Sequence, residues 1–467
     1  MRFSLYVFLS LIVVACQSKN GPETCGSAWI GGQIVNPKFD YVIISHNRNA
    51  SDTVYLDDNN FFRYHIKAAD PGLYYFQHFE FQAMFVEPGD SIMLRVNTLE
   101  FDESLTYTGP GAAKNNFLTE LFLLNESADQ EILSFYNLPP NSFTQKMDSV
   151  RSARQEFLEE FTNTNESSKT FLAVANAAID YAIYGKMELY VSSNNKKQRY
   201  GEQKEIPAEF FEYRKKLDLG HEDLRTYYPY FRCLGYYFDN LAFDAIQGQK
   251  EFNRMSFDHN WHKIDLIESK ITNDSLKQSL LKNTVINYFI NAENTEHMAL
   301  IMDKFNNYNQ SSEDEKVIAE LSEIALRLMP NQPLPDVELV NYENRTVGIQ
   351  EVINRPTVIY FWSLELPMHV KNIHQRISEL RGKYPEFDFI GINVDDQFKK
   401  WKRLVQHESY RTEHEFQFED FEKAGMALLI NSVNKTMMID ANGVIIDPHT
   451  NIFSLDAEQK LLNYLNR

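Results

Sequence analysis

Three cysteines are the side chains best suited to covalent chemistry, and they lie far apart, at Cys16, Cys25 and Cys233. A thiolate attacks disulfides and binds zinc, but both functions need partner residues at short, defined spacing. These three residues supply neither a Cys-x-x-Cys redox pair nor a four-thiolate zinc site. Cys25 and Cys233 either form a disulfide or remain separate, unreactive thiols, and the sequence leaves both alternatives open.

Histidines are the next candidates, because imidazole binds metals and transfers protons near neutral pH. His369 and His374 are five residues apart on a predicted helix, about 500° of rotation, so they do not share one face. The stretch 407–415 begins and ends with His-Glu, yet its charged composition predicts a solvated loop. The run 259–262 has two histidines but no partners at zinc-finger spacing. We therefore predict no metal site and no cofactor.

Net charge and missing motifs exclude several functional classes. The chain has 467 residues with 46 Lys plus Arg and 65 Asp plus Glu, a formal net charge of −19. Such a field repels phosphate backbones, so we expect no nucleic acid partner. The Gly-x-Ser-x-Gly, Walker A, Gly-x-Gly-x-x-Gly and His-Glu-x-x-His motifs are absent. The hydrophobic content of 43% is enough for large cores, and the length suggests about three domains.

The N-terminus has the pattern of a secretory signal. Residues 3–14 are almost continuously apolar, but this run is shorter than the roughly 20 residues that span a bilayer. Val13-Val14-Ala15-Cys16 resembles the bacterial lipobox, in which the cysteine is diacylated and becomes the mature N-terminus. We predict a signal peptide over 1–15 and a lipidated tether over 16–27, anchored in the cell envelope. Gln17 favours the outer membrane by analogy with enterobacterial sorting, and the periplasmic or surface face stays open.

Three segments follow the tether, each with its own periodicity. Residues 28–110 alternate in short aromatic and β-branched runs between turn clusters, which predicts an antiparallel β-sandwich. Residues 111–330 carry apolar residues at three- and four-residue steps, which predicts an all-α domain. Residues 331–467 alternate strands with helices and predict a small α/β domain. Its elements are expected at 337–339 with 346–349, 357–361, 367–383, 387–394, 397–407, 435–440 with 444–446, and 455–465.

Four segments of 331–467, together with the closing helix, form a recognisable set. They are Leu334-Pro335-Asp336-Val337, Val358 to Ser363, Gly391 to Asp395, and Met437 to Ile445. In kind and order they resemble the thioredoxin fold of the TlpA-like membrane-associated thiol:disulfide oxidoreductases. Residues 28–330 are similar to the sandwich and helical region that precede such domains in many Bacteroidetes lipoproteins. The implied fold class is multidomain α+β, with an N-terminal sandwich, a helical middle and a C-terminal thioredoxin-like domain.

The resemblance also implies a redox motif that this chain lacks. The family places Cys-x-x-Cys at the start of the helix after the Phe-Trp strand, where the helix dipole and free amides stabilise a thiolate. No cysteine follows Cys233, and the family's cis-proline falls at Asn434. The degenerate redox positions are Leu366, Pro367, Met368 and His369. We therefore expect no thiol exchange by this domain, and we interpret His369 as a solvated helix residue.

These observations lead to three hypotheses. The first is a non-enzymatic lipoprotein whose thioredoxin-like domain is a binding or scaffold module for an envelope protein or extended peptide, with the lipid contacting the membrane. The second is a thiol:disulfide oxidoreductase or isomerase that uses Cys233, with or without Cys25. The third is small-molecule or glycan binding by the helical domain, whose tyrosines either line a groove or pack between helices. Those tyrosines are Tyr181, Tyr184, Tyr190, Tyr213, Tyr227, Tyr228, Tyr230, Tyr236 and Tyr237.

Overall fold

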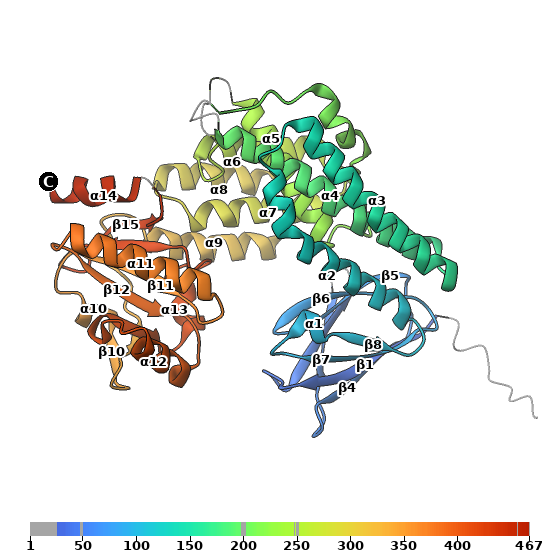
Figure 1. Ribbon diagram of the computed structural model, residues 1–467, viewed down its shortest axis with the longest axis horizontal. Coiled ribbons are helices and arrows are strands. Elements are labelled where there is room, and N and C mark those ends of the chain that lie inside the picture. Colours follow the sequence, from blue (N-terminus) through green and yellow to red (C-terminus); the bar gives the residue numbers. More distant parts are fainter. Residues whose placement is uncertain are drawn as a thin grey trace, which may run out of the picture. The chain divides into compact units, whose positions relative to one another are not determined.

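Strands, then helices, then a mixed segment follow one another along the chain (Figure 1). The computed structural model describes residues 26–46, 50–197, 202–246, 248, 252–454 and 456–466. They divide into two units: the first takes in the described residues up to Ser193 with Lys204–Leu234, and the second Asn194–Gln203 with everything from Gly235 onward. The helical region expected over 111–330 thus contributes to both units. Independent folding of the three expected domains stays a prediction.

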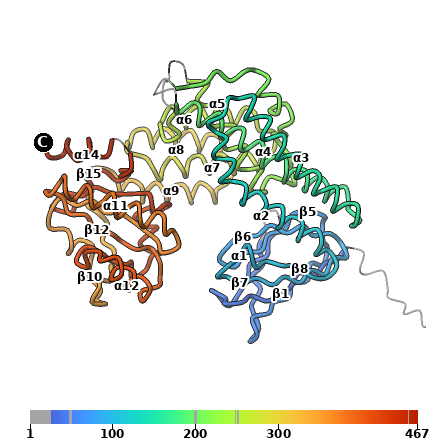
Figure 2. Tube along the Cα trace, in the orientation of Figure 1, coloured from blue at the N-terminus to red at the C-terminus, as the bar shows by residue number. Residues whose placement is uncertain are grey.

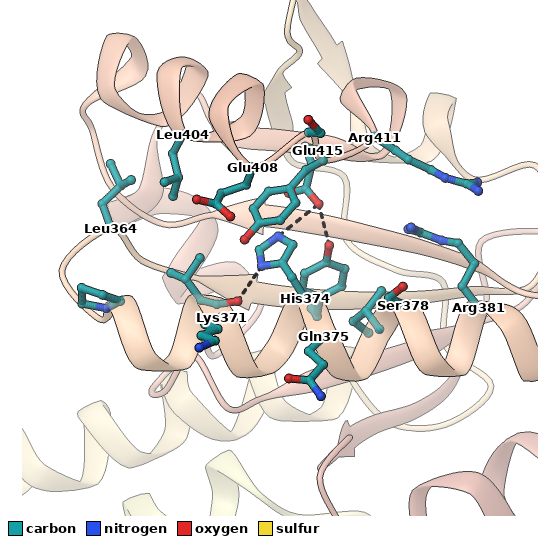
Figure 3. Close-up of a pocket in the computed structure, with 16 residues that line it drawn as sticks. Leu364, Lys371, His374, Gln375, Ser378, Arg381, Leu404, Glu408, Arg411 and Glu415 are labelled. Carbon is teal, nitrogen blue, oxygen red and sulfur yellow. Dashed lines mark hydrogen bonds and ion pairs between the residues drawn. The ribbon is translucent and has the colours of Figure 1, made fainter.

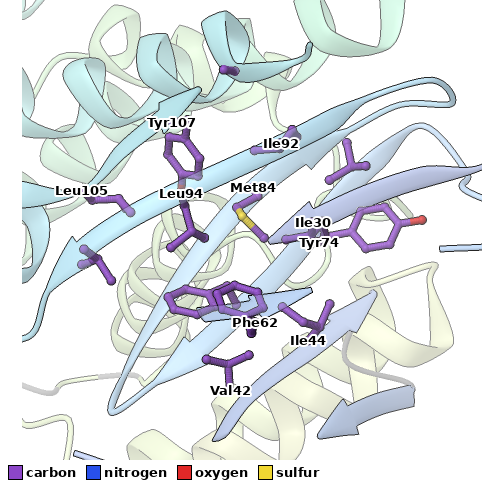
Figure 4. Packing of buried hydrophobic residues seen from close by; sticks show 14 of the residues in the cluster. Ile30, Val42, Ile44, Phe62, Tyr74, Met84, Ile92, Leu94, Leu105 and Tyr107 are labelled. Atoms are coloured by element: carbon purple, nitrogen blue, oxygen red, sulfur yellow. The ribbon is translucent and has the colours of Figure 1, made fainter. Parts of the chain in front are cut away.

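The first unit begins with two four-stranded sheets of order β4-β1-β7-β8 and β3-β2-β5-β6. Their inward side chains, among them Ile30, Val42, Phe62 and Leu94, form one apolar core (Figure 4). Side chains alternate between the two faces of a strand, which is why the alternating sequence gives each sheet an apolar face. The strands are β1 (Ala28–Val35), β2 (Tyr41–His46), β3 (Ala50–Tyr55), β4 (Phe61–Ile66), β5 (Gly72–His78), β6 (Glu80–Val86), β7 (Ser91–Asn97) and β8 (Thr106–Thr108).

The prediction that this sandwich is antiparallel is wrong for one strand pair. β1 and β7 run parallel, with Trp29 opposite Ser91 and Val35 opposite Asn97. The chain adds β4 to one edge of β1, continues through β5 and β6 in the other sheet, and then returns with β7 to the second edge of β1. Alternation in the sequence reports which face of a strand is buried, but it carries no information about a partner far along the chain.

Helices occupy the middle of the chain, as the apolar spacing predicts. Each of α6 to α9 is preceded by an N-cap residue whose side chain accepts a hydrogen bond from an amide of the first turn. These N-cap residues are Ser256, Asn273, Asn294 and Ser311. Among the described residues, no helix combines the length and apolarity needed to cross a bilayer. The helices are α1 (Phe101–Ser104), α2 (Ala112–Phe135), α3 (Pro140–Thr164), α4 (Lys169–Lys197), the 3₁₀ helix Ala208–Lys216, α5 (Tyr228–Ala245), α6 (Phe257–Lys270), α7 (Asp274–Ile290), α8 (Thr295–Tyr308) and α9 (Ser312–Arg327).

The C-terminal segment is built on a seven-stranded sheet of order β10-β9-β13-β12-β11-β14-β15. Its strands are β9 (Glu338–Val340), β10 (Thr346–Gly348), β11 (Thr357–Trp362), β12 (Asp388–Asn393), β13 (Glu415–Phe418), β14 (Thr436–Ile439) and β15 (Ile445–Thr450). Its helices are α10 (Ile349–Val352), α11 (Pro367–Lys383), α12 (Phe398–His407), the 3₁₀ turn Thr412–His414, α13 (Phe421–Ala427) and α14 (Asp456–Leu465).

The order and direction of these elements match those that the thioredoxin resemblance implies. β11 and β12 are parallel and joined through α11, β14 runs antiparallel to β11, and β15 runs antiparallel to β14. The last element of the chain is α14 (Figure 2). α11, α12 and α14 share one apolar core with the sheet face that carries Val358, Tyr360 and Trp362. Phe361 points to the other face, where its ring stacks on that of Phe418. β11 is therefore buried on both faces, as its continuous apolar sequence indicates.

Candidate functional site

The chain passes from β11 into α11 at the degenerate redox positions. Leu366 is the residue before the helix, and Pro367 is its first residue, a position that needs no amide hydrogen. Leu366 is 47% exposed and Met368 is 70% exposed. A helix N-terminus favours an anion, but these three side chains offer no ionisable group. The surface that performs thiol exchange in the resembled family is therefore apolar in this protein.

His369, at the position of the second redox cysteine, is not the solvated helix residue that we expected. Its two ring nitrogens are buried without a hydrogen-bond partner, and its ring lies edge-on to Phe453 with 6.3 Å between centroids. Burial, with a smaller contribution from the charge of His374, lowers the pKa of His369. The burial of the His369 ring could not be predicted from the sequence, because it depends on β15 and the turn after it, which bring Phe453 onto the start of α11.

Asn434, at the cis-proline position, is exposed, and no peptide bond in the described ranges is cis. Its neighbour Lys435 is a functional candidate that sequence reasoning missed. The Lys435 side chain is buried, and its Nζ donates to the main-chain oxygens of Leu428 at 2.7 Å and Leu429 at 3.2 Å. Burial lowers the pKa of Lys435 to about 7. A buried amine therefore lies next to Asn434, the position where the resembled family has its cis-proline.

A polar network fixes the loop that leads into α11. Ser363 Oγ donates to Asp395 Oδ1 at 2.6 Å, and the Leu364 amide donates to Asp395 Oδ2 at 2.6 Å. Asn393 Nδ2 donates to the same Oδ2 at 2.7 Å. Gln417 Nε2 donates to Asn393 Oδ1 at 2.9 Å. Because Asn393 and Gln417 are buried in neighbouring strands, this network connects the loop to the centre of the sheet.

Glu415 is the second candidate that the sequence did not reveal. Its carboxylate is buried and accepts a hydrogen bond from Tyr360 Oη at 2.6 Å and from Trp362 Nε1 at 3.0 Å. His374 Nε2 lies 3.3 Å from Glu415 Oε1, close enough for an ion pair but not aligned as a hydrogen bond. Burial, together with the charge of Glu415, raises the pKa of Tyr360 well above its usual value. Tyr360 therefore stays a hydrogen-bond donor to this carboxylate.

The prediction of a solvated loop over 407–415 is wrong at its C-terminal end. His407 is exposed at the end of α12, but Glu415 is 2% exposed and begins β13. The period-two sequence Glu415-Phe416-Gln417-Phe418 is the signal that could have predicted this strand. Its four residues are too few to stand out within a charged stretch.

A pocket of about 740 Å³ lies between α11 and the segment that follows α12 (Figure 3). His374 is at its centre, with Nδ1 donating to the Val370 oxygen at 2.8 Å. The His374 ring stacks on Tyr410 with 3.7 Å between centroids and an interplanar angle of 4°. Burial, with the charge of Glu408 next, raises the pKa of Tyr410 to about 12. The pocket therefore has a stacked aromatic floor above the buried Glu415.

Two of the three cysteines, Cys16 and Cys25, lie outside the described residues, so the lipidation site, the signal peptide and the Cys25–Cys233 disulfide stay predictions. Cys233 lies in α5 and is 0% exposed. Burial raises the pKa of its thiol well above the usual value. A reactive thiol needs exposure and a lowered pKa, and Cys233 has neither.

The tyrosines of the helical region mostly pack between helices. Tyr181 and Tyr230 meet edge to face at 4.7 Å, and Tyr184 stacks on Tyr213 at 5.4 Å. These four, together with Tyr190, are buried, whereas Tyr228 is exposed. Aromatic pairs of this geometry are typical of a packed core.

Comparisons with known proteins found fold-level similarity only. No protein-family model and no curated protein matches the chain. The chain is similar to the thioredoxin domain of a thiol-disulfide oxidoreductase from Bacteroides vulgatus, with 13% identity and a TM-score of 0.25. The match covers 29% of this chain and 98% of that one. A thioredoxin-like protein from Bacteroides caccae is 10% identical and covers 59% of this chain and 94% of its own, with a TM-score of 0.35. The fold assignment above rests on the strand order and register of the sheet.

Proposed function

We propose that this protein is a lipid-anchored component of the cell envelope whose thioredoxin-like domain binds another protein without exchanging thiols. The observation that carries the proposal is the start of α11, where Leu366 and Met368 are exposed and apolar. Leu366 and His369 stand at the two positions where the resembled family has its redox cysteines. Exposed apolar side chains next to one another are characteristic of protein-binding surfaces.

Two further contacts support a binding role for this surface. His369 connects Phe453, itself 42% exposed, to the start of the helix. We call Leu366, Met368 and Phe453 the loop patch. The hydrogen bonds to Asp395 hold the loop that presents the patch in one conformation. A preorganised surface loses less conformational entropy when a partner binds, which favours affinity.

The N-terminal sequence supports the anchoring part of the proposal. Cys16 follows the lipobox-like Val13-Val14-Ala15, and Gln17 follows it. Diacylation with a further acyl chain would hold the protein at a membrane stably, since one chain gives only marginal binding. We place the anchor in the outer membrane by analogy with bacterial lipoprotein sorting.

The other two hypotheses find less support. Oxidoreductase chemistry by Cys233 would require an exposed thiol with a lowered pKa, and this thiol is buried with a raised pKa. Ligand binding by the tyrosines of the helical region would require them to line a groove, and most of them are engaged in helix packing.

Partner recovery from solubilised native membranes tests the proposal. The full-length lipidated protein is purified together with its bound proteins, as wild type, as Met368→Asp and as Leu462→Asp. Leu462 lies in α14 of the same domain and is also exposed, so it is the matched control. We expect Met368→Asp to lower recovery of a specific partner by about tenfold, because a charge is unfavourable in a desolvated interface. Equal recovery with Met368→Asp and wild type would contradict the proposal.

A further inference from the structure

Two guanidinium groups lie at one end of the pocket between α11 and the segment after α12. Arg381 comes from the last turn of α11 and Arg411 from the segment that leads to β13. Figure 3 shows both side chains on the same side of His374, with Glu408 on the opposite side. The pocket therefore has a basic end formed by residues from two different segments.

Neither guanidinium is neutralised by the protein. Within the described ranges, no carboxylate lies at ion-pair distance from Arg381 or Arg411, although the chain has 65 acidic residues against 46 basic ones. The nearby carboxylate of Asp388 is already paired with Arg355 at 3.4 Å. Two arginines without an ion-pair partner that line one pocket create a local positive potential there.

One of the two guanidiniums, that of Arg381, is held by a hydrogen bond. Arg381 Nη2 donates to the main-chain oxygen of Phe389 in β12 at 3.1 Å, which leaves its other donors available to a ligand. The pocket floor is fixed by the stacking of His374 on Tyr410 and by the hydrogen bonds of Glu415 below them. Burial lowers the pKa of nearby His414, the charges of Arg381 and Arg411 lower it further, and the charges of Asp388 and Glu413 act in the opposite direction. Both guanidiniums therefore lie near His414.

We propose that this pocket binds a small molecule through an oxyanion, a carboxylate or a phosphate, held between Arg381 and Arg411. The planar guanidinium presents parallel N–H donors that match both groups in bidentate geometry. Glu408 at the opposite end disfavours a second anionic group there. The site is distinct from the loop patch, so a ligand here adds to the binding function proposed above and does not depend on it.

Titration calorimetry on the full-length protein in detergent tests the proposal, with inorganic phosphate and the monocarboxylate propionate as separate probes. We expect at least one probe to bind with a dissociation constant below about 1 mM. Binding of phosphate alone or of propionate alone identifies the preferred oxyanion. Absence of binding by both probes would overturn the proposal.

Charge-matched variants locate the binding. Arg381→Gln with Arg411→Gln is expected to weaken binding at least about tenfold, because charged hydrogen bonds are lost. Arg345→Gln with Arg403→Gln removes the same charge from exposed positions outside the pocket and should leave binding unchanged. If the double variant Arg381→Gln with Arg411→Gln does not fold, Arg411→Gln alone replaces it. The Arg411 side chain is exposed and makes no described contact, so this single variant should fold. It too should weaken binding. Equal affinity of the pocket variants and the control would overturn the assignment.

Discussion

Glu415 shows how a single buried carboxylate organises the centre of the thioredoxin-like domain. It joins β13 to β11 through Tyr360 and Trp362, and it lies beside His374 of α11. A buried acceptor with several donors is strongly stabilising only while all its partners are present, because the unpaired groups would otherwise lose their solvation without compensation. Stability should therefore depend on this residue more than on any exposed carboxylate around it.

We predict that Glu415→Ala lowers the free energy of unfolding by about 2–5 kcal/mol, because Tyr360 Oη and Trp362 Nε1 become buried donors without an acceptor. Glu415→Gln should cost less, since its amide oxygen still accepts one hydrogen bond. Glu408→Ala, an exposed carboxylate in the same pocket, should stay within about 0.5 kcal/mol of wild type. Urea unfolding measures all three, and a Glu415→Ala value no larger than that of Glu408→Ala would refute the structural role.

Lys435 gives a prediction about pH. Its pKa is about 7 in the folded protein, against 10.5 ordinarily, because of burial. Between these values the unfolded chain holds a proton that the folded chain has released, so stability rises with pH, by at most about 1.4 kcal/mol per unit. Below pH 7 both states are protonated, and this dependence ends. In Lys435→Met the free energy of unfolding should rise less steeply with pH between pH 7 and 10.5. Urea unfolding across this pH range measures the slope. The same slope in Lys435→Met and wild type would show that burial does not lower the pKa of Lys435.

At the scale of elements, β12 has a glycine, Gly391, where the side chains of Glu415 and Tyr360 meet. A Cβ atom at Gly391 would lie 2.5 Å from Glu415 Oε2 and 2.6 Å from Tyr360 Oη, so the absence of a side chain makes room for their hydrogen bond. Gly382 in α11 has no atom within 4 Å of the same built position. A side chain would therefore clash at Gly391 but would be accommodated at Gly382.

Alanine substitutions separate these two requirements. Gly391→Ala should destabilise the domain by about 1–3 kcal/mol through overpacking. Gly382→Ala should stabilise it by about 0.5–1 kcal/mol, because alanine loses less backbone entropy in a helix. Denaturant unfolding of both variants checks the contrast, and a neutral Gly391→Ala would mean that the Glu415 cluster is loosely packed.

Local sequence signals predicted most elements but not the contacts between them. α11 spans Pro367–Lys383 as expected, because a proline at the first helical position and apolar spacing are both readable from sequence. The parallel pairing of β1 with β7 was not predictable, because strand alternation does not identify a distant partner. The absence of cysteine at positions 366–369 is readable from the sequence alone. The burial of His369 and Glu415 was not, because it depends on Phe453, Tyr360 and α11 meeting in three dimensions.

At the scale of the whole molecule, the proposed lipid is at the N-terminal end of the sequence, and the domain for which we propose a binding role is at its C-terminal end. If Cys16 is the anchor, Cys16→Ser should move the protein from the membrane fraction to the aqueous fraction of the cell envelope, because no acyl chains are added. Cys25→Ser is the matched control and should stay in the membrane fraction. Cell fractionation with immunoblotting reads out both variants, and retention of Cys16→Ser in the membrane would disprove lipid anchoring at this residue.

The most direct measurement of the central claim is photo-crosslinking from the start of α11. A photoreactive amino acid replaces Met368 in the lipidated protein within its own cell envelope, and a second protein carries it at Leu462. We predict one reproducible protein adduct from position 368 that is absent from position 462 and persists when Cys25 and Cys233 are both changed to Ser. No adduct at 368, or an adduct that disappears with those cysteines, would contradict thiol-independent binding by this domain.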